Sequence, residues 1–279
     1  MKRSDKKQGK NTPGKKGGSI RKPSYSKSKT PRHKPLPQKE GSSHLVRLNK
    51  YIANAGVCSR READTFIAAG NVEVNGKTIT EMGFKVGPGD EVRFDGRLLR
   101  AEKKEYVLLN KPKNFITTTR DEKGRRTVME LVSGASASRL LPVGRLDRNT
   151  TGLLLFTNDG DLAKKLTHPR HGVRKIYHVE LDRNLKDSDL SKIRKGVNLE
   201  DGPITVDEVS YISGAPKKEI GMQLHSGRNR IVRRIFEHLD YRVVKLDRVV
   251  FAGLTKKDLP RGHWRALTTQ EVINLKNQS

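Results

Sequence analysis

Residues 144–160, with the sequence GRLDRNTTGLLLFTNDG, constrain the fold of this 279-residue chain more than any other stretch. Within them, residues 153–156 form a continuous apolar run that ends at the turn residues Asn158, Asp159 and Gly160. A short apolar run closed by turn residues is typical of a buried strand. The segment just before the run, which contains Asp147, is therefore expected to be a loop that leads into a rigid element, and such loops often carry catalytic residues.

Asp147 stands between two arginines, Arg145 and Arg148. A surface loop with a local ion pair would give the same pattern, and an exposed ion pair contributes only about 0–1 kcal/mol to stability. The residues by themselves leave both interpretations open, a catalytic carboxylate and a surface ion pair.

The charge of the chain points to a polyanionic partner. The formal net charge is +27 and the isoelectric point is near 10.3, which indicates nucleic acid first and an anionic membrane surface second. No apolar run approaches the roughly 18 residues of a spanning helix, and the N-terminus lacks the apolar core of a secretory signal. The single cysteine, Cys58, excludes an intramolecular disulfide framework and fits a reducing compartment. We expect a cytoplasmic protein without a membrane partner.

Residues 1–43 are rich in Lys, Ser, Gly and Pro and almost lack large apolar side chains. Such a segment cannot bury enough surface to offset the entropy lost on ordering, so a disordered basic tail is predicted. Two roles stay open for it, an arm that anchors RNA and a solubilising tail, because a flexible cationic segment binds phosphates in either case.

Residues 44–103 are predicted to form a small domain of two helices followed by short strands. Apolar residues recur at helical spacing from Leu48, and Ser59 with Glu62 has the spacing of a capping box that begins a second helix. Residues 72–74 alternate and lead into Asn75-Gly76, a strong hairpin turn.

Residues 104–279 are predicted to form a larger, catalytic domain. Strands are expected at 105–110, 174–181, 204–211 and 219–225, and helices at 187–195 and 230–238. These elements do not follow a regular strand–helix–strand rhythm, so an α+β fold with a mixed, mostly antiparallel sheet is expected.

Two stretches carry a resemblance to a known family. Residues 144–160 resemble the signature GRLDxxTxGLLLxTNDG of the pseudouridine synthases of the RsuA/RluB branch. Residues 46–76, VRLNKYIANAGVCSRREADTFIAAGNVEVNG, are similar to the S4 RNA-binding domain. The resemblance implies a small S4-type helix–helix–strand domain and a catalytic domain in which helices flank a mixed sheet.

The resemblance also implies the roles of individual residues. Asp147 takes the place of the essential catalytic aspartate, and Arg233, in GRNRIVRR, takes the place of the arginine that pairs with it. Tyr177, in KIYHV, matches the KxYxV tyrosine that stacks on the flipped base. The expected RNA-binding residues are Arg47, Lys50, Ser59, Arg60, Arg61, Arg145, Arg228 and Arg230.

Alternatives for these residues stay open. Without the motif, a strand tyrosine such as Tyr177 is more often a packing residue. The arginines at 228, 230, 233 and 234 could instead form a phosphate-binding helix face. Ile231 stands where the branch more often has a polar residue, commonly glutamine, which puts in doubt any RNA contact from that position.

The predicted function is isomerisation of a specific uridine in ribosomal RNA to pseudouridine. A 23S uridine is the expected target, and a 16S uridine is the alternative within the family. A noncatalytic ribosome assembly factor built on the S4 domain is a further alternative, although it would not need Asp147. An RNA methyltransferase would need a glycine-rich strand–helix turn, which the sequence lacks.

The reaction changes no oxidation state and loses no group, so we expect neither a metal nor an organic cofactor. His168 and His171 flank a proline and an arginine and do not form a convincing zinc set. A monomer that binds ribosomal RNA, with a ribosome assembly intermediate as a candidate substrate, is expected. Two routes stay open for Asp147, covalent attack on the sugar or base and abstraction of a ribose proton to give a glycal.

Overall fold

The computed structural model describes residues 45–278, so the predicted basic tail lies outside the described residues. None of the helices in this range is long and apolar enough to cross a membrane.

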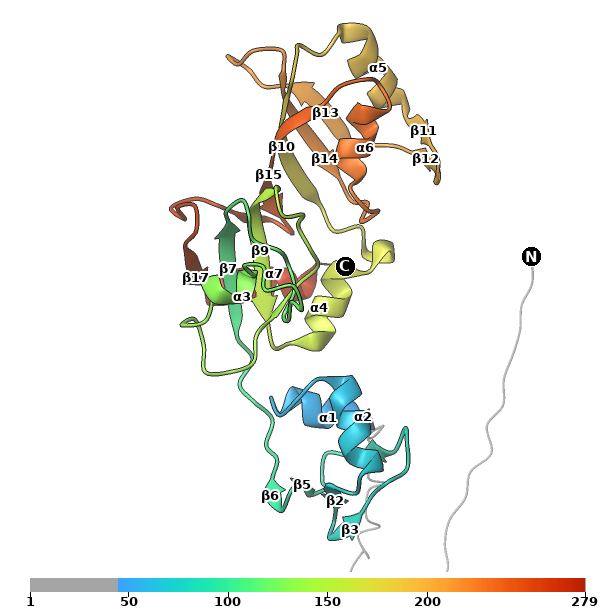
Figure 1. Cartoon of the computed structure of the whole chain (residues 1–279), viewed down its shortest axis with the longest axis vertical. Helices are drawn as coiled ribbons and strands as arrows, with labels where there is room; N and C mark the ends of the chain where they lie inside the picture. Colours follow the sequence, from blue (N-terminus) through green and yellow to red (C-terminus); the bar gives the residue numbers. More distant parts are fainter. Residues whose placement is uncertain (1–44, 279) are drawn as a thin grey trace, which may run out of the picture. The chain divides into compact units, whose positions relative to one another are not determined.

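The N-terminal part forms two helices and short strands, as predicted (Figure 1). Its elements are β1 (Val46–Arg47), α1 (Leu48–Asn54), α2 (Arg60–Ala68), β2 (Val72–Val74), β3 (Lys77–Thr78), β4 (Lys85–Val86), β5 (Val92–Phe94) and β6 (Arg97–Leu98). Strands β3, β2, β5 and β6 form an antiparallel sheet in that order, and β1 pairs with β4.

The local signals of this part are confirmed. Ser59 Oγ accepts a hydrogen bond from the backbone N–H of Glu62 (3.2 Å), and the Glu62 carboxylate accepts one from the Ser59 N–H (2.7 Å). This is a capping box, which satisfies two N–H groups at the start of α2. Asn75 and Gly76 have φ values of 52° and 76°, as the turn between β2 and β3 requires.

The C-terminal part is built around one nine-stranded sheet. Its strands are β7 (Tyr106–Lys111), β8 (Leu141–Pro142), β9 (Thr151–Thr157), β10 (Lys175–Leu181), β13 (Glu208–Tyr211), β14 (Glu219–Leu224), β15 (Val243–Phe251), β16 (Leu254–Thr255) and β17 (Trp264–Ala266). Outside the sheet lie α3 (Val128–Leu131), α4 (Gly160–Thr167), the 3-10 helix η1 (Pro169–His171), α5 (Asp187–Lys195), the hairpin strands β11 (Val197–Leu199) and β12 (Gly202–Ile204), α6 (Ile231–Glu237) and α7 (Thr269–Asn277).

The strand order is β13-β14-β10-β15-β9-β7-β17, with β16 beside β15 and β8 beside β9. Only the β15–β9 pair of this sheet is parallel, so the predicted α+β fold with a mixed, mostly antiparallel sheet is confirmed. The apolar run at 153–156 lies inside β9, and each of its four side chains is fully buried.

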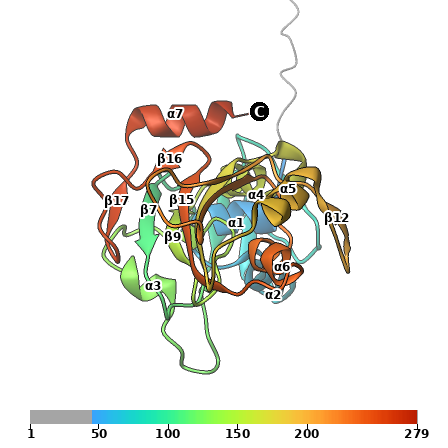
Figure 2. The same ribbon diagram turned by 90° about the horizontal axis from the view of Figure 1, so that it is seen from above.

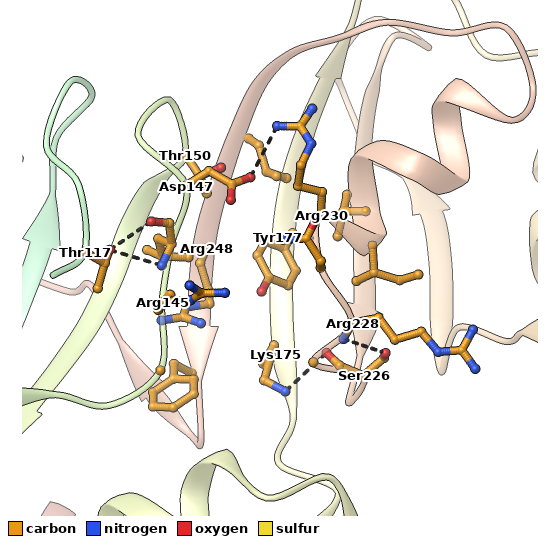
Figure 3. A pocket seen from close by; sticks show the side chains of 18 of the residues that line it. Thr117, Arg145, Asp147, Thr150, Lys175, Tyr177, Ser226, Arg228, Arg230 and Arg248 are labelled. Atoms are coloured by element: carbon orange, nitrogen blue, oxygen red, sulfur yellow. Dashed lines mark hydrogen bonds and ion pairs between the residues drawn. The ribbon is translucent and has the colours of Figure 1, made fainter. Parts of the chain in front are cut away.

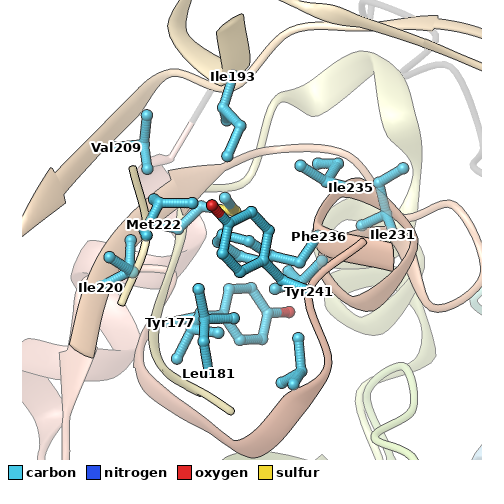
Figure 4. Packing of buried hydrophobic residues seen from close by; sticks show 14 of the residues in the cluster. Tyr177, Leu181, Ile193, Val209, Ile220, Met222, Ile231, Ile235, Phe236 and Tyr241 are labelled. Atoms are coloured by element: carbon cyan, nitrogen blue, oxygen red, sulfur yellow. The ribbon is translucent and has the colours of Figure 1, made fainter. Parts of the chain in front are cut away.

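The sheet is covered in separate apolar clusters. On one half, α5 and α6 pack on β10, β13 and β14, with Ile193, Val209, Ile235 and Phe236 among the buried residues (Figure 4). On the other half, α4 and α7 pack on one face of β7 and β9, and α3 packs on the opposite face (Figure 2).

Two predicted elements need correction. Residues 204–211 are not one strand: β12 ends at Ile204, in a hairpin with β11, and β13 begins at Glu208 in the main sheet. The predicted helix at 230–238 begins one residue later, because Arg230 has a left-handed backbone (φ 47°, ψ 30°) and forms its N-cap.

Candidate active site

A cleft of about 490 Å³ opens on the sheet where β9, β10 and β15 meet, beside the end of α4. Its wall on one side is the loop that precedes β9, and on the other side it is the turn between β14 and α6. Figure 3 shows the side chains of Asp147, Tyr177, Arg230 and Arg248 around the same space. The cleft therefore brings together motifs that are far apart in the sequence.

The loop that carries Asp147 is held by a buried lysine. Lys111, the last residue of β7, has no exposed surface. Its Nζ donates hydrogen bonds to the backbone carbonyls of Pro112 (3.1 Å), Asp147 (3.0 Å), Arg148 (3.3 Å) and Thr150 (2.8 Å). Burial lowers the pKa of Lys111 to about 8, and the nearby Asp147 carboxylate opposes that shift. One ammonium group thus binds three carbonyls of the loop that carries Asp147.

A threonine and a backbone amide complete this support. Thr117 Oγ1 donates to the Leu146 carbonyl (2.8 Å) and accepts from the Leu146 N–H (3.2 Å). The backbone N–H of Asn114 donates to the Arg148 carbonyl (2.9 Å). Side chains of a loop fixed in this way keep a defined position without a substrate, which reduces the cost of reaching a reactive geometry.

Gly152 of the signature is required by the sheet itself. It lies opposite Arg248 in the parallel pair of β9 and β15, and its φ is +106°. A Cβ at this position would lie 2.3 Å from the backbone oxygen of Arg248. Glycine therefore permits the close approach of β9 to the backbone of β15, directly after the loop that carries Asp147.

The carboxylate of Asp147 faces two arginines. Arg230 Nη1 lies 3.7 Å and Arg233 Nε lies 4.0 Å from Asp147 Oδ2. Arg233 is mostly buried, and its Nη1 donates to the Val243 carbonyl on β15 (2.9 Å). Burial lowers the pKa of Arg233, Arg230 lowers it further, and Asp147 opposes both. Two guanidinium groups thus lie near one carboxylate and offset its negative charge.

Arg230 reaches Asp147 from an unusual backbone conformation. A non-glycine residue at φ 47° is strained by about 1–2 kcal/mol, and such residues concentrate at functional sites. This left-handed residue directly precedes α6, and both Arg230 and Arg233 approach Asp147. Arg228 and Arg230 lie before the helix, so the alternative of one helix face formed by four arginines does not hold.

Tyr177 lies on β10 at the boundary between the cleft and the core. It is 9% exposed, and its ring belongs to the apolar cluster of α5 and α6. It also lines the cleft, next to Lys175 of the same strand. Tyr177 can therefore pack in the core and also contact a ligand in the cleft, two roles that the sequence left as alternatives.

The remaining predicted RNA-binding residues lie in different settings. Arg145 and Arg228 are exposed at the cleft, and Arg228 Nη1 donates to the Gly202 carbonyl (3.2 Å). Arg47, Arg60 and Arg61 are exposed on the N-terminal part, and Lys50 is half-buried. Ser59 uses its hydroxyl as the cap of α2.

Four residues of the site have roles that the sequence did not predict: Lys111, Thr117, Lys175 and Arg248. Lys175 Nζ donates to the carbonyls of His225 (2.8 Å) and Ser226 (3.3 Å), which holds the turn before Arg228. Burial, and then the charge of Arg248, lower the pKa of Lys175 to about 8, whereas Asp207 raises it. The KP pair directly after an apolar strand was the available signal for Lys111.

Within residues 45–278, no group of three histidine, cysteine or acidic side chains is placed to hold a metal ion. The described residues place one carboxylate near two guanidinium groups, in a cleft that an aromatic ring also lines. Such a carboxylate can act as a nucleophile or as a base.

Comparison with known proteins identifies relatives for most of the chain. The RNA pseudouridylate synthase family matches residues 105–238, and the S4 domain family matches residues 46–92. The boundary predicted between residues 103 and 104 lies between these two ranges and stays a prediction.

Two curated proteins are similar over most of their own length. The ribosomal large subunit pseudouridine synthase B of Bacillus subtilis is 40% identical over 235 residues, which cover 83% of this chain and 96% of that protein. The dual-specificity RNA pseudouridine synthase RluF of Escherichia coli is 37% identical over 82% of this chain and 78% of its own. A crystal structure of a pseudouridylate synthase superposes with a TM-score of 0.58 at 27% identity, covering 82% of this chain and 99% of that one.

Proposed function

This chain belongs to the RNA pseudouridylate synthase family, in the RsuA/RluB branch with an N-terminal S4 domain, and we propose that it isomerises one uridine of ribosomal RNA. The single observation that carries the assignment of the site is the Asp147 carboxylate, 3.7 Å from Arg230 and 4.0 Å from Arg233, in a cleft that Tyr177 also lines. A protein that only bound RNA would need the arginines but not the carboxylate between them.

The reaction breaks the bond between C1′ of the ribose and N1 of uracil, turns the base and joins C1′ to C5. The hydrogen on C5 leaves as a proton and N1 gains one, so atoms and electrons balance without a cofactor. We assign to Asp147 the step that opens the first bond, either as a nucleophile or as a base that takes a ribose proton. Arg230 and Arg233 lie near its carboxylate and offset its negative charge in the cleft.

The target base must leave the RNA stack, since the glycosidic bond is not accessible inside a helix. We propose that the extruded uracil stacks on Tyr177, which lines the cleft while its ring is fixed in the core. Stacking of a base on an aromatic side chain contributes about 1–3 kcal/mol. That is comparable with the cost of removing one base from a loop or a weak pair.

Exposed cations are available to bind the RNA backbone on both parts of the chain. Arg145 and Arg228 lie at the cleft, and Arg60 and Arg61 lie in the first turn of α2. Cations at a helix N-terminus are unfavourable by a few tenths of a kcal/mol, so a bound phosphate would offset them. We assign these four arginines to RNA binding, together with Arg47, Lys50, Ser59 and Arg230.

We propose a 23S uridine as the target. The Bacillus subtilis relative is named a large-subunit pseudouridine synthase, and the alignment with this chain covers 96% of its length. A 16S uridine is the alternative. We further propose that the protein works as a monomer in the cytoplasm, on naked ribosomal RNA or on an assembly intermediate.

The test is conversion of 23S and 16S transcripts by purified protein, with pseudouridine mapped at single-nucleotide resolution. Wild type should modify one 23S site, and Asp147→Asn should modify none while RNA affinity stays within a few-fold. Its melting temperature should remain close to that of wild type, which excludes misfolding as the cause. Turnover by Asp147→Asn would refute the role of Asp147, and conversion of 16S alone would move the target to the small subunit.

A further inference from the structure

Buried polar atoms without a partner gather at the catalytic cleft. Among residues 45–278, four buried side-chain nitrogen or oxygen atoms have no hydrogen-bond partner. One is Asn49 Oδ1 in the N-terminal part, and the others are Thr150 Oγ1, Arg233 Nε and Arg248 Nη2. Thr150 and Arg248 line the cleft, and Arg233 faces Asp147. Native proteins satisfy most buried polar groups, so this concentration marks the cleft as a place where hydrogen-bonding groups remain available to a substrate.

Arg248 is the most unusual of these residues, because its guanidinium group is buried without a carboxylate. The residue is 3% exposed. Its Nε donates to the Leu153 carbonyl (2.9 Å), and its guanidinium carbon lies 4.4 Å from the centre of the Phe251 ring. No described carboxylate forms an ion pair with it. Burial lowers the pKa of Arg248, and the neighbouring Tyr177 side chain opposes that shift.

A buried cation of this kind is costly. Arginine has five N–H donors and no acceptor; here Nε donates to the Leu153 carbonyl, the Tyr177 side chain is the other hydrogen-bonding group beside the guanidinium, and Nη2 has no partner within residues 45–278. Because arginine does not lose its proton at neutral pH, the charge remains and needs an acceptor. A ligand with a partly negative oxygen would supply that acceptor, and such a ligand must reach the bottom of the cleft.

Arg248 and Tyr177 lie directly opposite each other on adjacent strands, β15 and β10. Figure 3 shows the two side chains facing the same space, with Asp147 above them. A base stacked on Tyr177 would therefore turn its edge toward Arg248. Uracil has carbonyl oxygens at positions 2 and 4, and both are hydrogen-bond acceptors.

We infer that Arg248 is a substrate-binding residue that donates a hydrogen bond to a carbonyl oxygen of the extruded uracil. The inference rests on the proposed function. When the C1′–N1 bond breaks, its electron pair stays on the base, and the negative charge spreads onto the two carbonyl oxygens. A fixed guanidinium group stabilises that charge more than it stabilises neutral uracil, so Arg248 acts mainly on the rate of bond cleavage.

The setting favours a base over a phosphate group as the partner of Arg248. Phosphates of bound RNA remain largely solvated, and the exposed guanidinium groups of Arg145 and Arg228 are available to them at the rim of the cleft. Arg248 is instead buried against the Phe251 ring and the backbone of β9, so its free N–H groups suit a partner that leaves water, such as an extruded base, better than a solvated phosphate.

The experiment combines variants of Arg248 with changes of single atoms in the substrate. Single-turnover rates would be measured for wild type, Arg248→Met and Arg248→Lys on RNA with uridine, 2-thiouridine or 4-thiouridine at the target. Sulfur accepts hydrogen bonds more weakly than oxygen. The reaction should therefore be slower when sulfur replaces the carbonyl oxygen that Arg248 contacts. Arg194→Met is the matched control, because Arg194 Nε also donates to a strand carbonyl, that of Val209 (3.1 Å), but lies outside the cleft.

We expect Arg248→Met to lower the single-turnover rate about 10²–10³-fold with RNA affinity within three-fold, and Arg194→Met to match wild type. The single-turnover rate of wild type should fall at least ten-fold when one of the two thio-substrates replaces uridine. Arg248→Met should convert that thio-substrate and uridine at the same rate. Equal thio effects in wild type and Arg248→Met would overturn the inference. Arg248→Lys provides the same comparison if Arg248→Met does not fold.

One further outcome distinguishes a direct contact between Arg248 and the base from an indirect effect, and two others separate the inference from the proposed function. If Tyr177→Phe abolishes the thio effect as completely as Arg248→Met does, Arg248 acts only through the tyrosine hydroxyl and the inference is wrong. If wild type converts no uridine in any ribosomal RNA, the proposed function itself fails. An active wild type whose thio effects do not depend on Arg248 refutes only the inference.

Discussion

Replacement of Lys111 by methionine tests how the catalytic loop is held. Methionine fills a similar volume but removes the ammonium group that donates to the carbonyls of Pro112, Asp147, Arg148 and Thr150. Hydrogen bonds from a charged group contribute about 1.5–3 kcal/mol each, and burial of the charge offsets part of their sum. We expect a net loss of about 2–4 kcal/mol in the free energy of unfolding.

The same change should act more strongly on the rate than on RNA binding. Three of the four carbonyls belong to the loop of Asp147, so its carboxylate loses a fixed position relative to Arg233. A misplacement of about 1 Å can lower a rate roughly 100-fold. The assay is release of tritium from RNA with [5-³H]uridine, together with urea denaturation. Turnover within two-fold of wild type, or unchanged stability, would refute the role given to Lys111.

The pH dependence of Lys111 has opposite signs for stability and activity. Its pKa is about 8 in the folded protein and near 10.5 in an unfolded chain. Between these values the unfolded chain binds more protons, so the Lys111 contribution to stability rises with pH in this window. Activity should fall above about pH 8, because a neutral amine has only two hydrogens for four carbonyls. Lys111→Met should make the free energy of unfolding rise less steeply between about pH 8 and 10.5. The part of that rise that comes from Lys175 should remain.

Three further predictions concern the sheet, the S4 domain and the tail. Gly152→Ala should lower the free energy of unfolding by more than about 2 kcal/mol, because its Cβ would lie 2.3 Å from a backbone oxygen. Gly221→Ala is the control, because its Cβ would lie 3.8 Å from the nearest atom. Equal urea midpoints for the two variants would contradict this prediction. Arg60→Ala and Arg61→Ala should each reduce the slope of log K against log salt by about 1, and an unchanged slope would exclude the phosphate contact. Removal of residues 1–43 should weaken RNA binding most at low salt and reduce the slope of log K against log salt. An unchanged slope would show that these residues do not contact RNA phosphates.

Elements with strong local signals were predictable from the sequence. The apolar run at 153–156 is a buried strand, the helix at 187–195 has the bounds that its spacing indicates, and Ser59 with Glu62 forms the capping box. Each of these rests on neighbours in the chain, which is why a pattern of residues was sufficient.

The parts that the sequence did not reveal depend on contacts between distant segments. Lysine and arginine are almost never fully buried unless they are paired, so Lys111-Pro112 after the apolar run is only a weak signal for the burial of Lys111, and no neighbour in the sequence indicates the burial of Arg248. Arg230 leaves the helical conformation although its neighbours favour a helix, because the turn from β14 must bring it toward Asp147. The break at residues 205–207 separates two strands that belong to different sheets, and periodicity alone cannot detect that.

The central claim is most directly tested by a pseudouridine map of ribosomal RNA from cells that lack this gene, complemented with wild type or with Asp147→Asn. The account predicts that one 23S pseudouridine disappears, that wild type restores it and that Asp147→Asn does not, although both proteins accumulate to the same level. A map that does not change on loss of the gene, or a site that Asp147→Asn restores, would contradict it.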